Sequence, residues 1–296
     1  RVGARTILLG GFRVDRFNKL RRWIVSPRAG FKHSVTGNLN WRVSISTGFR
    51  APEIFNEDLH VAQVGGEGFL IENSPGLREE KSVSLSAGLD YVGRVGRRPY
   101  RMGANFFWTD LRNNFQLIEV PSPVPGSRLL LRVNGPGSYV RGVDFDANVS
   151  LSPRLSLRGG ATLQVARYKE PEEQFGSLSF FRSPERYGFF GLDWILPGRV
   201  ELTSTTEFLG PMLVPHYAGY IPEDRLERTQ SFVVVNAVVS KLLAVSDKAR
   251  LRVFLNINNI ADTYQPDLDR GPNRDSSYVY GPTQMRRVIL GLTWEF

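Results

Sequence analysis

Residues 39–49 read LNWRVSISTGF, and this stretch decides the fold class. Apolar and polar residues alternate along it with a period of two, which is typical of a β-strand because successive side chains point to opposite faces. The stretch therefore predicts a strand with one apolar face and one wet face. The first face holds Leu39, Trp41, Val43, Ile45, Thr47 and Phe49, and the second holds Asn40, Arg42, Ser44, Ser46 and Gly48.

The same alternation recurs along the whole chain. The predicted strands approach the ~9–11 residues of a tilted membrane-spanning strand, which exceeds the ~5–6 residues usual in soluble proteins. Their polar faces are rich in Ser, Gly, Asn and Arg, which suits a hydrated lumen. We therefore predict an all-β, transmembrane, antiparallel up-and-down β-barrel with about twelve strands in this chain. They are expected at residues 5–17, 23–33, 39–49, 82–92, 99–112, 128–151, 154–167, 186–196, 199–209, 231–241, 249–258 and 283–296.

The connections between these strands are an independent test of the barrel. After the first connection, short and long ones alternate, as in outer-membrane barrels, where turns and loops lie on opposite sides. This order depends on one interpretation, namely that residues 128–151 form a single long strand with a bend at the glycines of residues 134–137. The short connections are residues 34–38, 93–98, 152–153, 197–198 and 242–248, and the long ones are 50–81, 113–127, 168–185, 210–230 and 259–282.

Composition narrows the class of protein further. The chain has 296 residues, no cysteine and a formal net charge of +9, and nothing in it divides it into two domains. No apolar run reaches the ~20 residues of a membrane-spanning helix. The basic residues are scattered, so we expect no nucleic-acid partner. The positive net charge is explained better by a polar, arginine-rich lumen and by barrel rims that contact outer-membrane lipid and lipopolysaccharide than by a nucleic-acid partner.

Six short motifs resemble those of TonB-dependent outer-membrane receptors. Their order and spacing together are specific, and the resemblance covers the chain from the first strand to the last residue. They are STGFRAPE at residues 46–53, PGLREEKS at 75–82, NFFWTDL at 105–111, VRGVDF at 140–145, NINNIAD at 256–262 and the aromatic terminal residue Phe296. Two motifs depart from the family pattern, since residues 78–80 lack its proline and residues 258–260 read NNI in place of Asn-Leu-Phe.

This resemblance implies a larger protein. Family members carry a globular plug followed by a barrel of about 22 strands. We therefore expect residues 1–296 to be the C-terminal portion of such a barrel, without the plug and the first strands. The implied function is that of part of a receptor in the outer membrane of a Gram-negative cell. It would serve TonB-energised uptake of a scarce bulky nutrient, such as a ferric siderophore or a cobalamin-like chelate. The implied partners are this small-molecule chelate and, through the missing N-terminal part, the TonB complex.

A second function stays open on the sequence alone, namely a self-contained passive pore or an outer-membrane surface protein without energy coupling. We expect no enzyme, no metal and no cofactor, because His33, His60 and His216 are scattered without metal-ligand spacing. The acidic stretch at residues 267–275 lacks the alternating oxygens and the closing Glu of an EF-hand, so we interpret it as a charged external loop.

The resemblance also predicts the side on which substrate binds. In the family the last strand runs down to the periplasm, so the connection before it, and every other long connection, is expected outside. Aromatic side chains in these loops could stack on an aromatic chelate. The alternative is that they belong to the aromatic belt of the membrane interface. The candidate substrate-binding residues are His60, Tyr217, Tyr220, Tyr264, Arg270, Arg274, Tyr278 and Tyr280.

Overall fold

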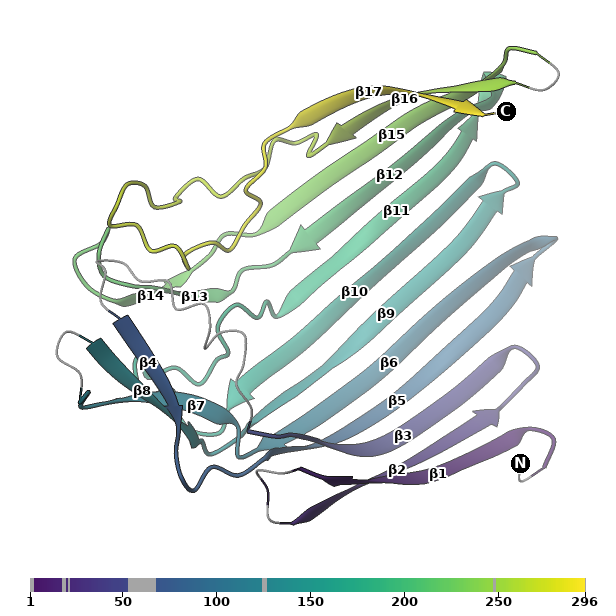
Figure 1. Ribbon diagram of the computed structural model, residues 1–296. Helices are drawn as coiled ribbons and strands as arrows, with labels where there is room; N and C mark the ends of the chain where they lie inside the picture. Colours follow the sequence, from purple (N-terminus) through teal and green to yellow (C-terminus); the bar gives the residue numbers. More distant parts are fainter. Residues whose placement is uncertain are drawn as a thin grey trace.

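A computed structural model describes residues 3–17, 20, 22–52, 68–123, 127–246 and 249–295. These residues form one large antiparallel sheet of twelve strands and two small sheets beside it (Figure 1). The strands of the large sheet, in sheet order, are β1 (Thr6–Arg16), β2 (Trp23–Ser34), β3 (Leu39–Arg50), β5 (Glu80–Val95), β6 (Arg98–Arg112), β9 (Ser138–Ser152), β10 (Leu155–Tyr168), β11 (Arg186–Leu196), β12 (Val200–Leu209), β15 (Phe232–Ala244), β16 (Arg250–Asn258) and β17 (Arg287–Glu295).

The large sheet has the form of a barrel wall. Figure 1 shows its strands side by side and inclined in one direction, with the short turns and both termini on the right and the long connections on the left. β1 and β17 are its two edges, and within the described residues neither pairs with a strand on its other side. The predicted fold class is therefore confirmed.

Helix is nearly absent from this fold. In the part of the chain that the structure describes, the only helical element is the 3-10 turn η1 (Pro197–Arg199), which joins β11 to β12. Among these residues, no helix is long and apolar enough to cross a membrane.

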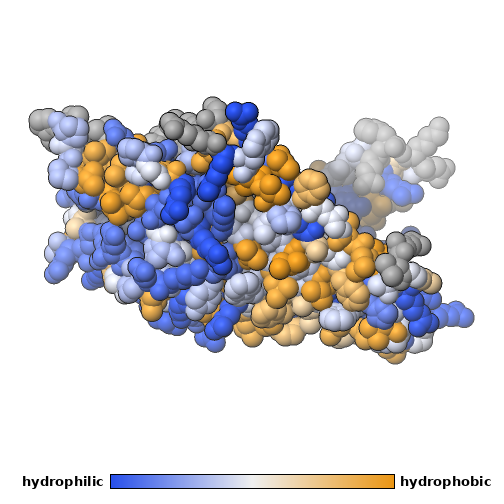
Figure 2. Space-filling model, turned by 90° about the horizontal axis from the view of Figure 1, so that it is seen from below, coloured by the Kyte–Doolittle hydropathy of each residue, from blue (hydrophilic) through white to orange (hydrophobic). Residues whose placement is uncertain are grey.

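Strand register gives the wall two different faces, because residues opposite each other in paired strands share a face. Trp41 lies opposite Leu89 on what we call the lipid-side face, and Arg42 lies opposite Gly88 on the lumen-side face. In Figure 2, hydrophobic residues (orange) gather in surface patches, most clearly on the right of the view. Exposed large apolar residues of the lipid-side face include Leu8, Phe12, Val25, Trp41, Ile45, Leu89, Met102, Phe145, Leu163, Phe190, Trp194, Val239, Leu290 and Leu292. A wall that exposes such residues is suited to lipid rather than water.

The lumen-side face is lined by polar groups that pair across strands. Arg42 of β3 forms an ion pair with Asp90 of β5. Farther along the sheet, Nη1 of Arg158 lies 2.7 Å from Oδ2 of Asp193, whose Oδ1 accepts a hydrogen bond from Thr203. The arginine side chains of both pairs are about half exposed, so each pair contributes little to stability. Their consequence is a hydrated and charged inner surface, as the sequence pattern predicts.

The single long strand predicted at residues 128–151 is wrong. β8 (Ser127–Asn134) leaves the wall and lies between β4 (Gly68–Asn73) and β7 (Phe115–Val120) in a three-stranded sheet, and β9 alone continues the wall. The chain turns at Gly137, where φ is +106°. A Cβ atom there would lie 2.4 Å from the carbonyl oxygen of Leu111, so only glycine fits this turn.

The long connections form a second structural region, which we call the cap. It comprises residues 68–79, 113–137, 169–185, 210–231 and 259–286 of the described chain. Besides the three-stranded sheet, it contains the antiparallel pair β13 (Leu213–His216) and β14 (Arg225–Arg228). One of the two small apolar clusters of the described residues lies in it, with Met212, Val214 and Tyr278 at its centre.

Candidate ligand-binding site in the cap

A buried histidine connects two segments of the cap. His216, at the end of β13, is 3% exposed. Its Nδ1 lies 2.8 Å from Oε1 of Glu227 on β14, and its Nε2 lies 3.0 Å from Oδ2 of Asp269 in residues 259–286. Each ring nitrogen can donate to the carboxylate beside it when that nitrogen carries a proton. The hairpin and the last long loop are therefore joined through a buried imidazole.

Two tyrosines extend this His216 network. The ring of Tyr278 stacks on His216 with 3.7 Å between ring centroids, and its hydroxyl lies 3.0 Å from Oε2 of Glu227 and from Oδ2 of Asp267. The hydroxyl of Tyr280 donates to Oδ1 of Asp267 at 2.6 Å. Burial, reinforced by the adjacent carboxylates, raises the pKa of both tyrosine hydroxyls. Both side chains therefore remain neutral hydrogen-bond donors at neutral pH.

A pocket of about 400 Å³, which we call the loop pocket, opens beside the His216 network. Tyr220, Arg225 and Arg270 line it together with network residues. Arg225 is held by Glu227, with 2.7 Å between Nε and Oε1, whereas Tyr220 is 54% exposed. The pocket thus presents guanidinium, phenol and carboxylate groups, which can bind a polar ligand by several hydrogen bonds.

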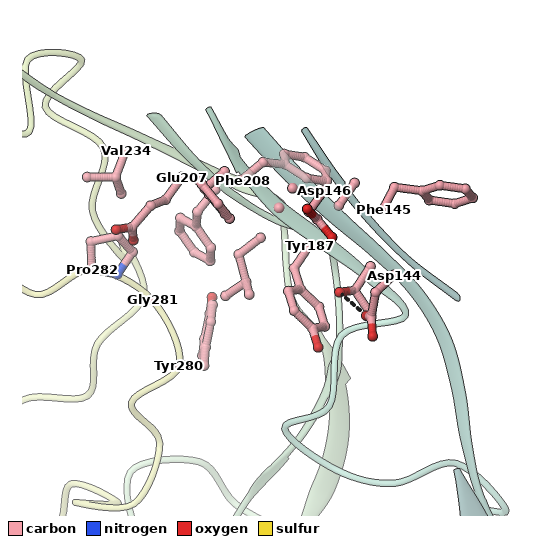
Figure 3. Close-up of a pocket in the computed structure, with 17 residues that line it drawn as sticks. Asp144, Phe145, Asp146, Tyr187, Glu207, Phe208, Val234, Tyr280, Gly281 and Pro282 are labelled. Carbon is pink, nitrogen blue, oxygen red and sulfur yellow. Dashed lines mark hydrogen bonds between the residues drawn. The ribbon is translucent and has the colours of Figure 1, made fainter. Parts of the chain in front are cut away.

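A second pocket, of about 640 Å³, lies where the cap meets the lumen-side face, and we call it the lumen pocket (Figure 3). Residues 280–282 form one side of it, opposite strands of the wall. Asp144, Asp146 and Glu207 contribute three carboxylates, and Tyr187 contributes an aromatic ring. The recess under the cap is otherwise mostly apolar and aromatic, because Phe189, Phe208 and Phe232 also line it.

The structure brings four of the predicted binding residues to these pockets. Tyr220, Arg270 and Tyr278 line the loop pocket, and Tyr280 lines the lumen pocket. Tyr278 is only 2% exposed and stacks on His216, so its ring is not accessible for stacking on a ligand. Tyr220 and Arg270 are the two predicted residues whose side chains are both exposed and pocket-lining.

The other predicted residues lie elsewhere. Tyr264 is 43% exposed on the cap surface, and Arg274 donates a hydrogen bond to a backbone carbonyl of its own loop. The backbone N–H of Tyr217 donates to the carboxylate of Asp275. None of these three lines either pocket. His60 lies outside the described residues.

Sequence reasoning missed most of the polar groups that build these pockets. The acidic stretch at residues 267–275 is not simply a charged external loop, because the side chain of Asp269 is 2% exposed and binds His216. Among the described residues, no group of three or more His, Asp or Glu side chains is arranged to hold a metal ion. The lumen-pocket residues Asp144, Asp146 and Glu207 were detectable, because the period of two places them on the wet face.

Together, the curved antiparallel sheet, its apolar outer face, its polar inner face and the long loops at one end define the class of outer-membrane β-barrel proteins. Within this class, the chain belongs to the family described as TonB dependent receptor-like, beta-barrel, which it matches over residues 1–260. This is a family of outer-membrane receptors and not of enzymes. No curated protein sequence matches the chain.

Solved structures of several receptors share the fold. A mutant of the ferric enterobactin receptor PfeA from Pseudomonas aeruginosa matches with a TM-score of 0.69 and 17% identity, over 99% of this chain and 43% of its own. The siderophore receptor PirA from Acinetobacter baumannii matches with a TM-score of 0.69 and 15% identity, over 100% and 44%. The ferric-catecholate import receptor Fiu from K12 E. coli matches with a TM-score of 0.65 and 19% identity, over 93% and 35%. The chain thus spans less than half the length of each.

Proposed function

We propose that this chain forms part of the barrel wall and the external cap of a receptor in the outer membrane of a Gram-negative cell. The receptor takes up a scarce bulky nutrient, such as a ferric siderophore or a cobalamin-like chelate, with energy from the TonB complex. The observation that carries the proposal is the asymmetry between the two ends of the wall. In the described part of the chain, one end of the wall has only short turns, whereas the other carries both small sheets, the His216 network and the loop pocket. Ligand capture requires such a surface on one side only.

The two sheet edges support a barrel larger than this chain. In lipid, each unpaired backbone N–H or C=O group costs several kcal/mol, so a stable wall has no free edge. β1 and β17 therefore require partner strands, which we assign to a part of the receptor outside residues 1–296. We assign the plug and the contact with TonB to that part as well.

The direction of the last strand supports the orientation. β17 runs from the cap to the end that carries the short turns (Figure 1). Outer-membrane barrels have short turns on the periplasmic side and longer loops outside. On this basis the cap faces the exterior, where a scarce nutrient is captured, and the turns face the periplasm.

The loop pocket supports an anionic chelate with aromatic or hydroxyl groups as the ligand. Arg270 offers a guanidinium for charge-assisted hydrogen bonds, and Tyr220 offers an exposed ring for stacking. The structures with the same fold are a ferric enterobactin receptor, a siderophore receptor and a ferric-catecholate import receptor by their own names. We therefore rank ferric siderophores above cobalamin-like chelates.

Binding and growth measurements on the full-length receptor test this proposal. Arg270→Ala and Tyr220→Ala are expected to weaken binding of a ferric siderophore by about tenfold, since each removes a direct polar or stacking contact. Arg274→Ala and Tyr264→Ala are matched controls from the same cap and are expected to bind normally. Uptake should stop when the proton gradient is dissipated. A large constant conductance in planar bilayers, without ligand binding, would contradict the proposal and favour a passive pore.

A further inference from the structure

A groove of about 630 Å³ lies on the lipid-side face of β5, β6, β9 and β10. Small residues form its floor, namely Ala104, Ala147, Gly159 and Ala161. Because these residues lack large side chains, an extended hydrocarbon chain can approach the sheet closely and gain many dispersion contacts. The larger residues around this floor are Leu39, Leu89, Tyr91, Met102 and Phe145, and register places all of them on the same face.

Toward the short turns the groove ends in an aromatic pair. The rings of Tyr91 and Tyr100 stack with 5.7 Å between their centroids. They lie over Gly93, where a Cβ atom would come within 2.5 Å of the Tyr100 ring, so glycine provides the space that the pair occupies. Tyrosine prefers the membrane interface, because its ring can be buried while its hydroxyl stays wet. The pair therefore marks the headgroup level on this part of the wall.

Beyond the aromatic pair, two neighbouring turns carry exposed arginines. Arg97 and Arg98 lie at the β5–β6 turn, and Arg154 lies at the β9–β10 turn. The two turns are adjacent because β6 pairs with β9. Within the described residues none of these three guanidinium groups has a carboxylate partner. Arg98 precedes Met102 of the groove by about 13 Å of extended strand, which is within the length of one acyl chain.

We propose that the wall binds a phospholipid with an anionic headgroup at this place. One acyl chain lies in the groove, the glycerol region lies against the Tyr91–Tyr100 pair, and the phosphate lies among Arg97, Arg98 and Arg154. The apolar, aromatic and cationic zones follow one another along the strands in the order of the corresponding parts of the lipid. Charge complementarity favours this occupant over a second copy of the chain, which would bury three unpaired guanidinium groups. The inference rests on the proposed function only in that the lipid-side face lies in a membrane.

Filling the groove tests the acyl-chain part of the proposal. The probe is palmitoyl-oleoyl phosphatidylglycerol, and native mass spectrometry of the purified full-length protein in micelles measures the lipid retained. Ala161→Leu places a longer side chain on the groove floor and is expected to weaken binding of one lipid by about tenfold, through lost apolar burial. Ala237→Leu makes the same change on the lipid-side face of β15, outside the groove, and should bind like the wild type.

Removing the arginines tests the headgroup part. The double variant Arg98→Gln and Arg154→Gln should lose the preference for phosphatidylglycerol over phosphatidylethanolamine, whereas Lys241→Gln, at the turn end of β15, should keep it. Retention that is unchanged in either set of variants would overturn the lipid site. Membrane insertion is measured separately, by the gel shift between folded and heated protein. Failure of the wild type to insert would contradict the proposed function, whereas insertion with unchanged lipid retention would contradict the lipid site alone.

Discussion

The wall and the cap of this chain are stabilised in different ways. In the wall, each strand pairs with its neighbour along most of its length, and side chains on either face meet lipid or water. In the cap, a few buried polar groups connect segments that are distant in sequence, as in the contact between His216 and Asp269, which are 53 positions apart. The wall therefore depends on a repeated local pattern, and the cap depends on particular side chains. Substitutions should separate these two kinds of stability.

Removing His216 is expected to have the largest effect, confined to the cap. In His216→Ala, the side chain of Asp269, only 2% exposed, loses its imidazole partner while it stays buried. A buried polar group that loses its hydrogen-bond partner costs about 1–3 kcal/mol. Because His216 bonds to both Glu227 and Asp269, we expect a loss of about 3–5 kcal/mol in the free energy of local opening. Hydrogen exchange of residues 213–228 measures this loss, with β16 as the internal control. Unchanged protection of the hairpin would show that the network does not stabilise the cap.

A charge on the lipid-side face is expected to have the next largest effect, confined to the wall. Ile45→Arg should lower the free energy of unfolding in bilayers by about 2–4 kcal/mol, because the guanidinium would face hydrocarbon. Its sequence neighbour Ser44 faces the lumen, so Ser44→Arg is a matched control with an expected loss of less than about 1 kcal/mol. Urea unfolding in lipid vesicles measures both. Equal losses for the two variants would contradict the assignment of the two faces.

Acidification is expected to have the smallest effect, and it should loosen the cap before the wall. Burial alone would raise the pKa of the Glu227 carboxyl, but hydrogen bonds from His216, Arg225 and Tyr278 outweigh burial, and the net pKa is lowered. A lowered folded-state pKa stabilises the fold above the unfolded value, about 4.3 for glutamate, and this contribution is lost as the pH falls below it. Hydrogen exchange, corrected for its intrinsic pH dependence, should show that the β13–β14 hairpin opens more often as the pH falls below about 4.3.

The variant Glu227→Gln is the control for the acid effect. Because glutamine does not titrate here, the variant should open to a similar extent above and below pH ~4.3. Acid opening of the hairpin that is the same in the wild type and in this variant would assign the transition to another group.

The wall could be predicted from the sequence because its determinants are local. A period of two over residues 39–49 places Trp41 on one face and Arg42 on the other. Pairing of neighbouring strands then extends these two faces across the whole sheet. The same pattern failed at residues 128–151, where parity continues across the glycines. In this region β8 pairs with β4, which is distant in sequence, and a local pattern of residues cannot predict a distant pairing partner.

The cap could be predicted only in part, for the same physical reason. Its position, on one side of the wall, follows from the lengths of the connections, and the exposure of Tyr220 and Arg270 follows from their place in two of the long loops. The burial of the Asp269 side chain does not follow from the sequence, because a solvent-exposed aspartate in such a loop would have the same local sequence pattern. Its partner His216 lies in a different loop, and only the folded chain brings the two together.

Single-cysteine labelling tests the central claim, that the cap lies outside and the short turns lie in the periplasm. The chain has no cysteine, so each introduced thiol is unique within it. Glu173→Cys, Glu223→Cys and Asn273→Cys are at exposed cap positions, and Arg154→Cys is at an exposed turn. With an impermeant maleimide on intact cells that produce the full-length receptor, we predict labelling at the three cap positions, and at the turn only after the outer membrane is permeabilised. Labelling of the turn but not of the cap on intact cells would contradict the orientation and the assignment of the ligand-binding side.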